Sequence, residues 1–146
     1  MTESFFEISS PRDLFEKAKR DFERMKSDLN TDSIFNFFVT VYHVMDYVKA
    51  QGNARQDAIE KMYDDEDFRM CNYLCNKGKH LKLEKGDEFQ TRHSVGAVFG
   101  KAMFNEVMFN EGESYSLIAD GQKIDVTELG HRLLKKWEQL FAYNGI

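Results

Sequence analysis

Apolar residues recur every three or four positions through most of the chain, which is the spacing of one face of an α-helix. The first such stretch covers about residues 10–29, and Ser10 and Pro11 at its beginning are typical of a helix start. A second stretch covers about residues 31–49, with Gly52 beyond it as a helix-end signal. Because this second stretch is apolar around most of its circumference, we expect a helix at the centre of a bundle.

The stretch at residues 67–83 has two faces of opposite chemistry when it is placed on a helix. One face is apolar and includes Cys71 and Cys75. The other face carries a continuous stripe of polar side chains: Arg69, Asn72, Tyr73, Asn76 and His80, with Lys79 at its margin. We look for function in this stripe. The acids at 64–67 stand where the helix begins, so capping explains them better than metal binding. Before them, residues 53–66 predict a short helix or an ordered connection.

The hydrophobic period changes in the part of the chain that follows this helix. Residues 84–95 are polar and contain a glycine, so we expect a mobile loop. Residues 97–110 mix apolar and polar positions, and residues 114–119 alternate more clearly, as in a strand. Asp120 and Gly121 then give a strong hairpin signal. These patterns predict a small antiparallel sheet of two or three strands.

A last amphipathic helix is predicted at the end of the sequence. Asp125 and Glu128 have the spacing of a capping box, and apolar residues keep helical spacing to about Tyr143. The fold class is therefore mainly α, a helical bundle with a small antiparallel hairpin or three-stranded sheet before a C-terminal helix. We expect a single domain over residues 1–146, in which the hairpin and last helix, about 96–146, are appended to the helical part.

The composition is that of a folded domain with an aromatic-rich core. Of the 146 residues, 42% are hydrophobic and 14% aromatic, and a single Pro is present, which excludes a disordered chain. The net charge of −5 means that contact with a polyanion must be local. No segment has the pattern of a signal peptide or of a membrane helix, so we expect a cytoplasmic protein with no membrane contact. The two Cys are expected to be reduced core thiols, since a zinc site needs two further soft ligands.

Two polar residues of the second helix belong to the same candidate site. His43 and Asp46 are three residues apart and can meet on one helix face. They could share one pocket with residues of the later polar stripe: Asn76, Lys79 and His80. The ordinary alternative is a solvated pair or a structural hydrogen bond. If the pocket forms, we expect Asp46 and His80 to be joined by a hydrogen bond, either direct or through one water.

Two segments of the sequence carry a resemblance to known proteins: FFVTVYHVMDYV on the second helix and CNYLCNKGKHLKL on the later one. They resemble a group of small bacterial proteins whose pattern is His-x-x-Asp followed by Asn-x-x-Lys-His. That arrangement is in turn similar to the HEPN superfamily of helical nucleases and nucleotide-binding domains. The resemblance covers about residues 10–83, and the hairpin and last helix resemble the small group only.

The resemblance implies a role for several residues. HEPN nucleases usually carry an Arg, often followed by a polar residue, then three residues and a His, and two such helices meet in a dimer to form a metal-independent RNA-cleaving site. On this resemblance, Asn76 and His80 match the polar residue and the histidine, and Asp46 matches an acid from an earlier helix. The arginine position is Cys75, which cannot hold a phosphate by charged hydrogen bonds. Lys79 is the cation best placed to substitute, as a point charge.

Three functions compete on this basis. The one we favour is a HEPN-like module that binds RNA, a nucleotide or a protein partner in a toxin–antitoxin or phage-defence setting. The second is a metal-independent endoribonuclease, and the third is a metal-dependent hydrolase. The candidate residues are, for catalysis, His80, Asp46 and His43, and, for binding, Asn76, Lys79, Arg69 and Tyr73. We expect no cofactor and no bound metal, and a homodimer in which two copies of the His80 helix face a common cleft.

Overall fold

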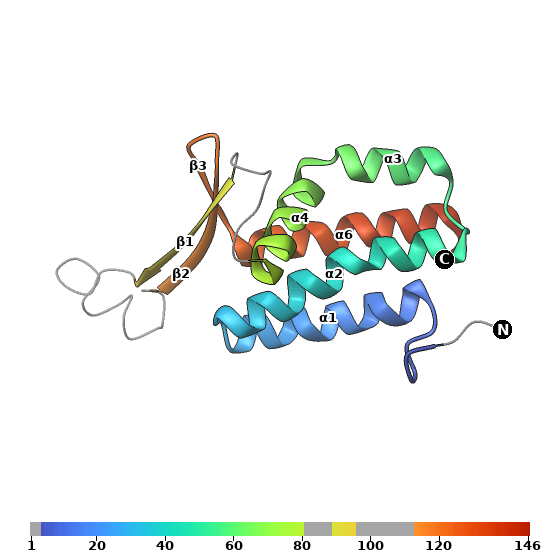
Figure 1. The fold of residues 1–146 in the computed structure, drawn as a ribbon, viewed down its shortest axis with the longest axis horizontal. Helices are drawn as coiled ribbons and strands as arrows, with labels where there is room; N and C mark the ends of the chain where they lie inside the picture. The colour runs from blue at the N-terminus through green and yellow to red at the C-terminus, as the bar shows by residue number, and fades with distance from the viewer. Residues whose placement is uncertain (1–3, 81–88, 96–112) are drawn as a thin grey trace.

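The computed structural model describes residues 4–80, 89–95 and 113–146 as a helical bundle with a small sheet at one end (Figure 1). The elements follow in the order α1 (Pro11–Ser27), α2 (Thr31–Gln51), α3 (Gln56–Asp64), α4 (Glu66–Lys79), β1 (Phe89–Val95), β2 (Glu113–Ala119), β3 (Gln122–Asp125) and α6 (Val126–Asn144). The protein is therefore mainly α, with a three-stranded antiparallel sheet before the C-terminal helix, as the sequence predicts.

Polar side chains cap the helices where the sequence predicts starts. Ser10 accepts a hydrogen bond from the backbone N–H of Asp13 at the start of α1. Asn30 and Ser33 form a reciprocal capping box at the start of α2. Asp125 accepts from two backbone N–H groups at the start of α6. Each cap satisfies donors that a helix end would otherwise leave unpaired, so these local sequences fix the element boundaries.

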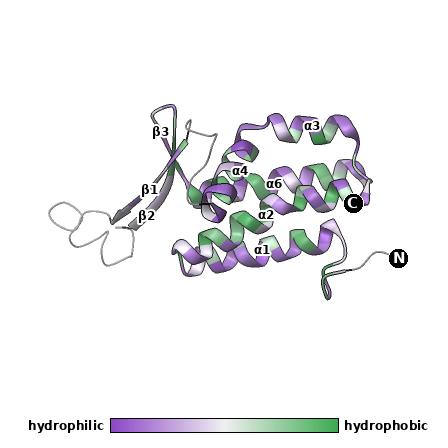
Figure 2. Cartoon of the chain, viewed as in Figure 1, coloured by the Kyte–Doolittle hydropathy of each residue, from purple (hydrophilic) through white to green (hydrophobic). Residues whose placement is uncertain are grey.

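Large aromatic side chains fill the core between α1, α2, α4 and α6. The fully buried ones are Phe15, Phe37, Phe38, Phe68, Trp137 and Phe141. Gly130 of α6 lets the helices approach closely, because a Cβ there would lie 2.8 Å from the Phe22 ring and 2.9 Å from the Phe37 ring. Hydrophobic residues accordingly gather along α2 and α6, whereas α3 is mostly hydrophilic (Figure 2). No helix in the described ranges is long and apolar enough to cross a membrane.

A buried carboxylate fixes α1 to α2. Asp21 is 5% exposed and accepts hydrogen bonds from Lys17, Arg24 and Thr40 at 2.6 to 3.0 Å. Thr40 lies on α2, so its hydroxyl links the two helices directly. A buried ion needs such partners to offset the loss of hydration, which explains why a polar residue can occupy this position.

The sheet has β2 in the centre, with β1 and β3 antiparallel on either side. Asp120 and Gly121 form the turn between β2 and β3 with positive φ angles of 50° and 76°, which confirms the predicted hairpin. The expectation of a mobile loop at 84–95 is wrong for residues 89–95, which form β1. Only Phe89 of the described side chains in β1 is buried, so the strand depends on pairing with β2 rather than on its own apolar pattern. The strand predicted within 97–110 lies outside the described residues.

The α4 helix is shorter than the expected helix over residues 67–83. It ends at Lys79, and His80 adopts an extended conformation with φ −128° and ψ 125°. The His80 backbone N–H still donates to the Asn76 carbonyl, at 2.8 Å. His80 is therefore a residue of the helix end rather than of the polar helix face. Gly78 in the last turn explains the early end, because glycine costs about 1 kcal/mol relative to alanine inside a helix.

Candidate functional site

The α4 helix packs antiparallel to α2, so its C-terminal end lies near the beginning of α2. Gly78 faces Phe35, because a Cβ on Gly78 would be 2.7 Å from the Phe35 ring. At the other end, the Phe68 ring stacks on Tyr42 with 5.3 Å between ring centroids. This arrangement decides which of the predicted site residues can meet.

The His43 and Asp46 side chains lie near each other on α2, as their spacing predicts. The His43 Nε2 atom is 3.9 Å from the Asp46 Oδ2 atom, which is within ion-pair range but too long for a hydrogen bond. The other ring nitrogen, Nδ1, is 2.7 Å from the Val39 carbonyl and donates to it. His43 is thus oriented by the backbone of its own helix, as an ordinary structural histidine would be.

No direct hydrogen bond joins Asp46 to His80 within the described part of the chain. Asp46 is eleven residues beyond Phe35, about 16 Å along the α2 axis. His80 instead follows Gly78, which lies against Phe35. The structure thus joins these two described side chains by no direct hydrogen bond, and the predicted link through one water stays a prediction.

Cys75 and Cys71 are buried, free thiols, which confirms the predicted core thiols. Burial raises the pKa of Cys75; the nearby Asp46 carboxylate raises this pKa further, and the Lys79 ammonium lowers it. Burial also raises the pKa of Cys71, well above its ordinary value. Both thiols are consequently neutral near pH 7. At the position that the resemblance assigns to an arginine, this protein has a neutral buried group.

The remaining residues of the polar stripe on α4 make different kinds of contact. The Asn76 side-chain amide donates a hydrogen bond to the Asn72 side-chain oxygen. Tyr73 packs edge-on against Phe89 with 5.6 Å between ring centroids, which anchors the first strand to the helix. Arg69 and Lys79 are exposed. The stripe is therefore partly structural, and its cations lie at separate places along α4.

A cleft that the sequence did not reveal lies between the start of α2, the end of α4 and the strands β1 and β2. Its volume is about 270 Å³. The residues that line it are Thr31, Ile34, Phe35, Phe38, Leu74, Lys77, Gly78, Thr91, Arg92, His93, Tyr115, Ser116 and Val126. We call it the sheet cleft. Because its walls come from five elements, with Val126 belonging to α6, it exists only in the folded bundle.

Two cationic side chains line the sheet cleft. They are Lys77 of α4 and Arg92 of β1, and the described residues that line the cleft include no carboxylate. Three other clefts formed by described residues each contain at least one Asp or Glu. In a chain of net charge −5, these two cations give the described lining of the cleft a local positive charge.

Aromatic rings accompany these cations. Phe35 is 41% exposed although it is a large apolar side chain. On the strand wall, the His93 and Tyr115 rings stack in parallel, with centroids 4.1 Å apart and planes 5° apart. Phe35 therefore offers an accessible ring face or edge beside two cations, a combination that suits planar anionic ligands.

An ion network at the other end of α4 explains the acidic run at 64–67. Asp65 caps the helix by accepting a hydrogen bond from the Phe68 N–H. It also accepts a hydrogen bond from the Lys136 ammonium, at 2.6 Å. Asp67 accepts hydrogen bonds from Lys136 and Arg132, both on α6. The capping role is confirmed, whereas the tie to α6 was not visible in the sequence. Nowhere in the described ranges do three or more His, Cys, Asp or Glu side chains gather as metal ligands.

Comparisons with protein-family models, with curated proteins and with solved structures find no match for this chain.

Proposed function

We propose that the protein is a non-catalytic, HEPN-like module that binds RNA or a nucleotide in the sheet cleft. The observation that carries the proposal is the convergence of Lys77 and Arg92 on one cleft beside the exposed Phe35 ring. A phosphate would pair with these two cations, and Arg92 can offer two parallel N–H donors to it. The resemblance implies a toxin–antitoxin or phage-defence setting, which is part of the same proposal.

The apolar part of the cleft suits the base of such a ligand. Phe35 is exposed at the rim, and Phe38, Ile34 and Leu74 provide further apolar surface. Stacking of a base on an aromatic side chain typically contributes about 1–3 kcal/mol and tolerates any base. Binding would therefore combine a charged contact that depends on salt with a stacking contact that does not.

Two observations support binding rather than cleavage. The neutral thiol of Cys75 cannot stabilise the charge that develops on a phosphate in the transition state. The His80 side chain makes no hydrogen bond to another described residue, so nothing in that part of the chain orients its ring. A general acid or base needs such orientation, and a binding residue does not.

The experiment measures the affinity of a fluorescently labelled single-stranded RNA and of a labelled adenine nucleotide by anisotropy. Arg92→Ala should weaken binding roughly fivefold, as expected for the loss of about 1 kcal/mol from an exposed charged contact. It should also reduce the slope of log affinity against log salt by about 0.7 for RNA. The matched control is Arg20→Ala, because Arg20 is exposed on α1 and lines none of the clefts described above.

Phe35→Ala tests the stacking contact separately. It should weaken binding while the salt slope stays unchanged, since no charge is removed. Equal affinities for wild type, Arg92→Ala and Arg20→Ala would contradict the proposed site. RNA cleavage in EDTA by the wild type and not by His80→Ala would instead favour the endoribonuclease.

A further inference from the structure

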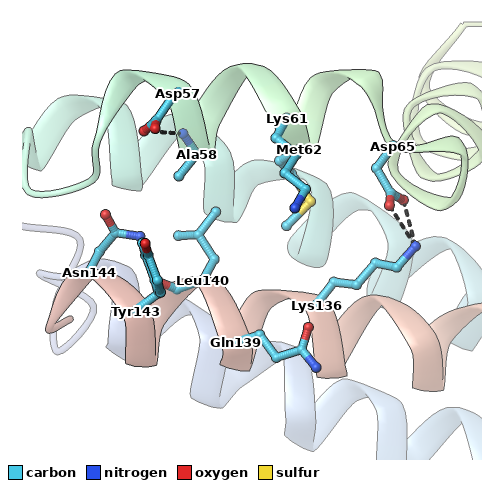
Figure 3. Close-up of a pocket in the computed structure, with 10 residues that line it drawn as sticks. All are labelled: Asp57, Ala58, Lys61, Met62, Asp65, Lys136, Gln139, Leu140, Tyr143 and Asn144. Atoms are coloured by element: carbon cyan, nitrogen blue, oxygen red, sulfur yellow. Dashed lines mark hydrogen bonds and ion pairs between the residues drawn. The ribbon is translucent and has the colours of Figure 1, made fainter.

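A second concave site lies between α3 and α6, on a part of the bundle remote from the sheet (Figures 1 and 3). Its volume is about 550 Å³, within the usual range for a small-molecule pocket. We call it the α3–α6 groove. A polar contact between α3 and α6 lies at each end of the groove. At one end the Arg55 backbone N–H donates to the Asn144 side chain, at 2.9 Å, and at the other Lys136 binds Asp65. These links join the two ends of α3 to α6, and the two helices form the walls of the groove.

The surface of the groove is apolar between the two polar ends. Met62 of α3 and Leu140 of α6 are 6% and 7% exposed, and both contribute to it. Tyr143 lies beside Leu140 at the Asn144 end (Figure 3). The Tyr143 side chain is 76% exposed, which is unusual for so large a ring. An apolar ligand would cover mainly the Tyr143 ring and the small exposed parts of Met62 and Leu140.

One of the four charged side chains that line the groove is not paired with another described residue. Asp57 accepts hydrogen bonds from Arg55 and from the Ala58 N–H, and Asp65 accepts from Lys136. Lys61 lies between these two acids along α3 and extends beside Met62 (Figure 3). Its ammonium makes no ion pair or hydrogen bond with another described residue. Lys61 is therefore the charged side chain of the groove that is available to a ligand.

We propose that the α3–α6 groove binds a small apolar carboxylate, an aliphatic or aromatic acid. The carboxylate pairs with Lys61, and the apolar body covers Met62, Leu140 and Tyr143. The charge complementarity selects an acid over a neutral or cationic molecule of equal length. This site shares no residue with the sheet cleft, so it does not depend on the proposed function.

The test compares octanoate, octanol and octylammonium, which share a chain length and differ in charge. Binding to the full-length protein is followed by chemical shifts in two-dimensional NMR spectra. Octanoate should bind about fivefold more tightly than octanol, the effect of one exposed ion pair, and octylammonium should bind most weakly. The resonances of Lys61, Met62 and Tyr143 should shift together.

Variants decide whether Lys61 is responsible for the selection. Lys61→Gln should abolish the preference for octanoate over octanol, and Lys61→Glu should reverse it in favour of octylammonium. Lys135→Gln is the matched control, because Lys135 is exposed on α6 outside the groove, and it should leave the preference intact. Equal binding of the three probes by the wild type, shifts outside the groove, or a preference unchanged in Lys61→Gln would each overturn the proposal.

Discussion

Cys75 shows how burial limits the chemistry available at one position. The thiol is completely buried, and burial keeps it neutral by raising its pKa. An arginine at the same position would place a guanidinium in this packed environment. This position therefore favours a small neutral side chain over the arginine that the HEPN resemblance implies.

A cation at this position should destabilise the fold. Cys75→Arg should lower the free energy of unfolding by about 3 kcal/mol, because it combines overpacking with burial of an unpaired charge. Cys75→Ala, the matched control, should cost about 1 kcal/mol, since it removes only one sulfur atom. Urea denaturation followed by circular dichroism measures both. A Cys75→Arg protein as stable as the wild type would show that the site accepts a cation.

The candidate site could be predicted only in part from residue identities. The proximity of His43 and Asp46 follows from their spacing on one helix, and the structure confirms it. Arg92 was missed because it belongs to a polar strand with little apolar pattern of its own. Phe35 belongs to the stretch that predicts a central helix, and its apolar character gives no sign that it is 41% exposed. Such clefts are products of tertiary packing, which local periodicity does not encode.

Ion pairs join the N-terminal end of α4 to α6. Burial alone would raise the pKa of Asp67, but hydrogen bonds and charge interactions with Lys136 and Arg132 outweigh this effect and lower the pKa below 3.8. Burial lowers the pKa of Lys136, and its bonds to Asp65 and Asp67 outweigh that and raise it. Both shifts favour the charged forms, so the network stabilises the contact between the helices at neutral pH.

A pH dependence at the element scale follows from the lowered pKa of Asp67. The folded state holds the proton of Asp67 less tightly than the unfolded chain does. The resulting stabilisation is complete above the unfolded pKa of about 4 and is lost as the pH falls through the lower folded value. Urea denaturation between about pH 6 and pH 2.5 should therefore show a fall in stability that is smaller in Asp67→Asn. Asp64→Asn is the control, because Asp64 is exposed at the end of α3. Identical pH profiles for the wild type and Asp67→Asn would refute this assignment.

Elements with strong local signals were predicted well, and those that depend on distant partners were not. The starts of α1, α2 and α6 follow from caps and apolar spacing within a few residues of each helix. The sequence predicts a loop where the first strand lies, because each residue of β1 pairs with a residue of β2 that is 18 to 30 positions away. The helix end at Lys79 was missed because residues beyond it keep helical spacing, whereas the backbone at His80 is already extended.

At the scale of the whole molecule, the resemblance predicts a homodimer with the two α4 helices near each other. In such a dimer the two His80 residues and the two sheet clefts would approach a common surface. Light scattering at tens of micromolar protein should give twice the mass of 17.1 kDa. A monomer at this concentration would count against the dimer, and the sheet cleft would then act as a site within one chain.

Trp137 gives this protein a built-in optical probe. It is the only tryptophan of the chain, and it is fully buried between Phe68 and Phe141. Its Nε1–H has no hydrogen-bond partner among the described residues. An indole shielded from water emits at shorter wavelength than one in solvent. A red shift of its emission therefore reports the separation of α4 from α6, independently of the helix content of α1 and α2.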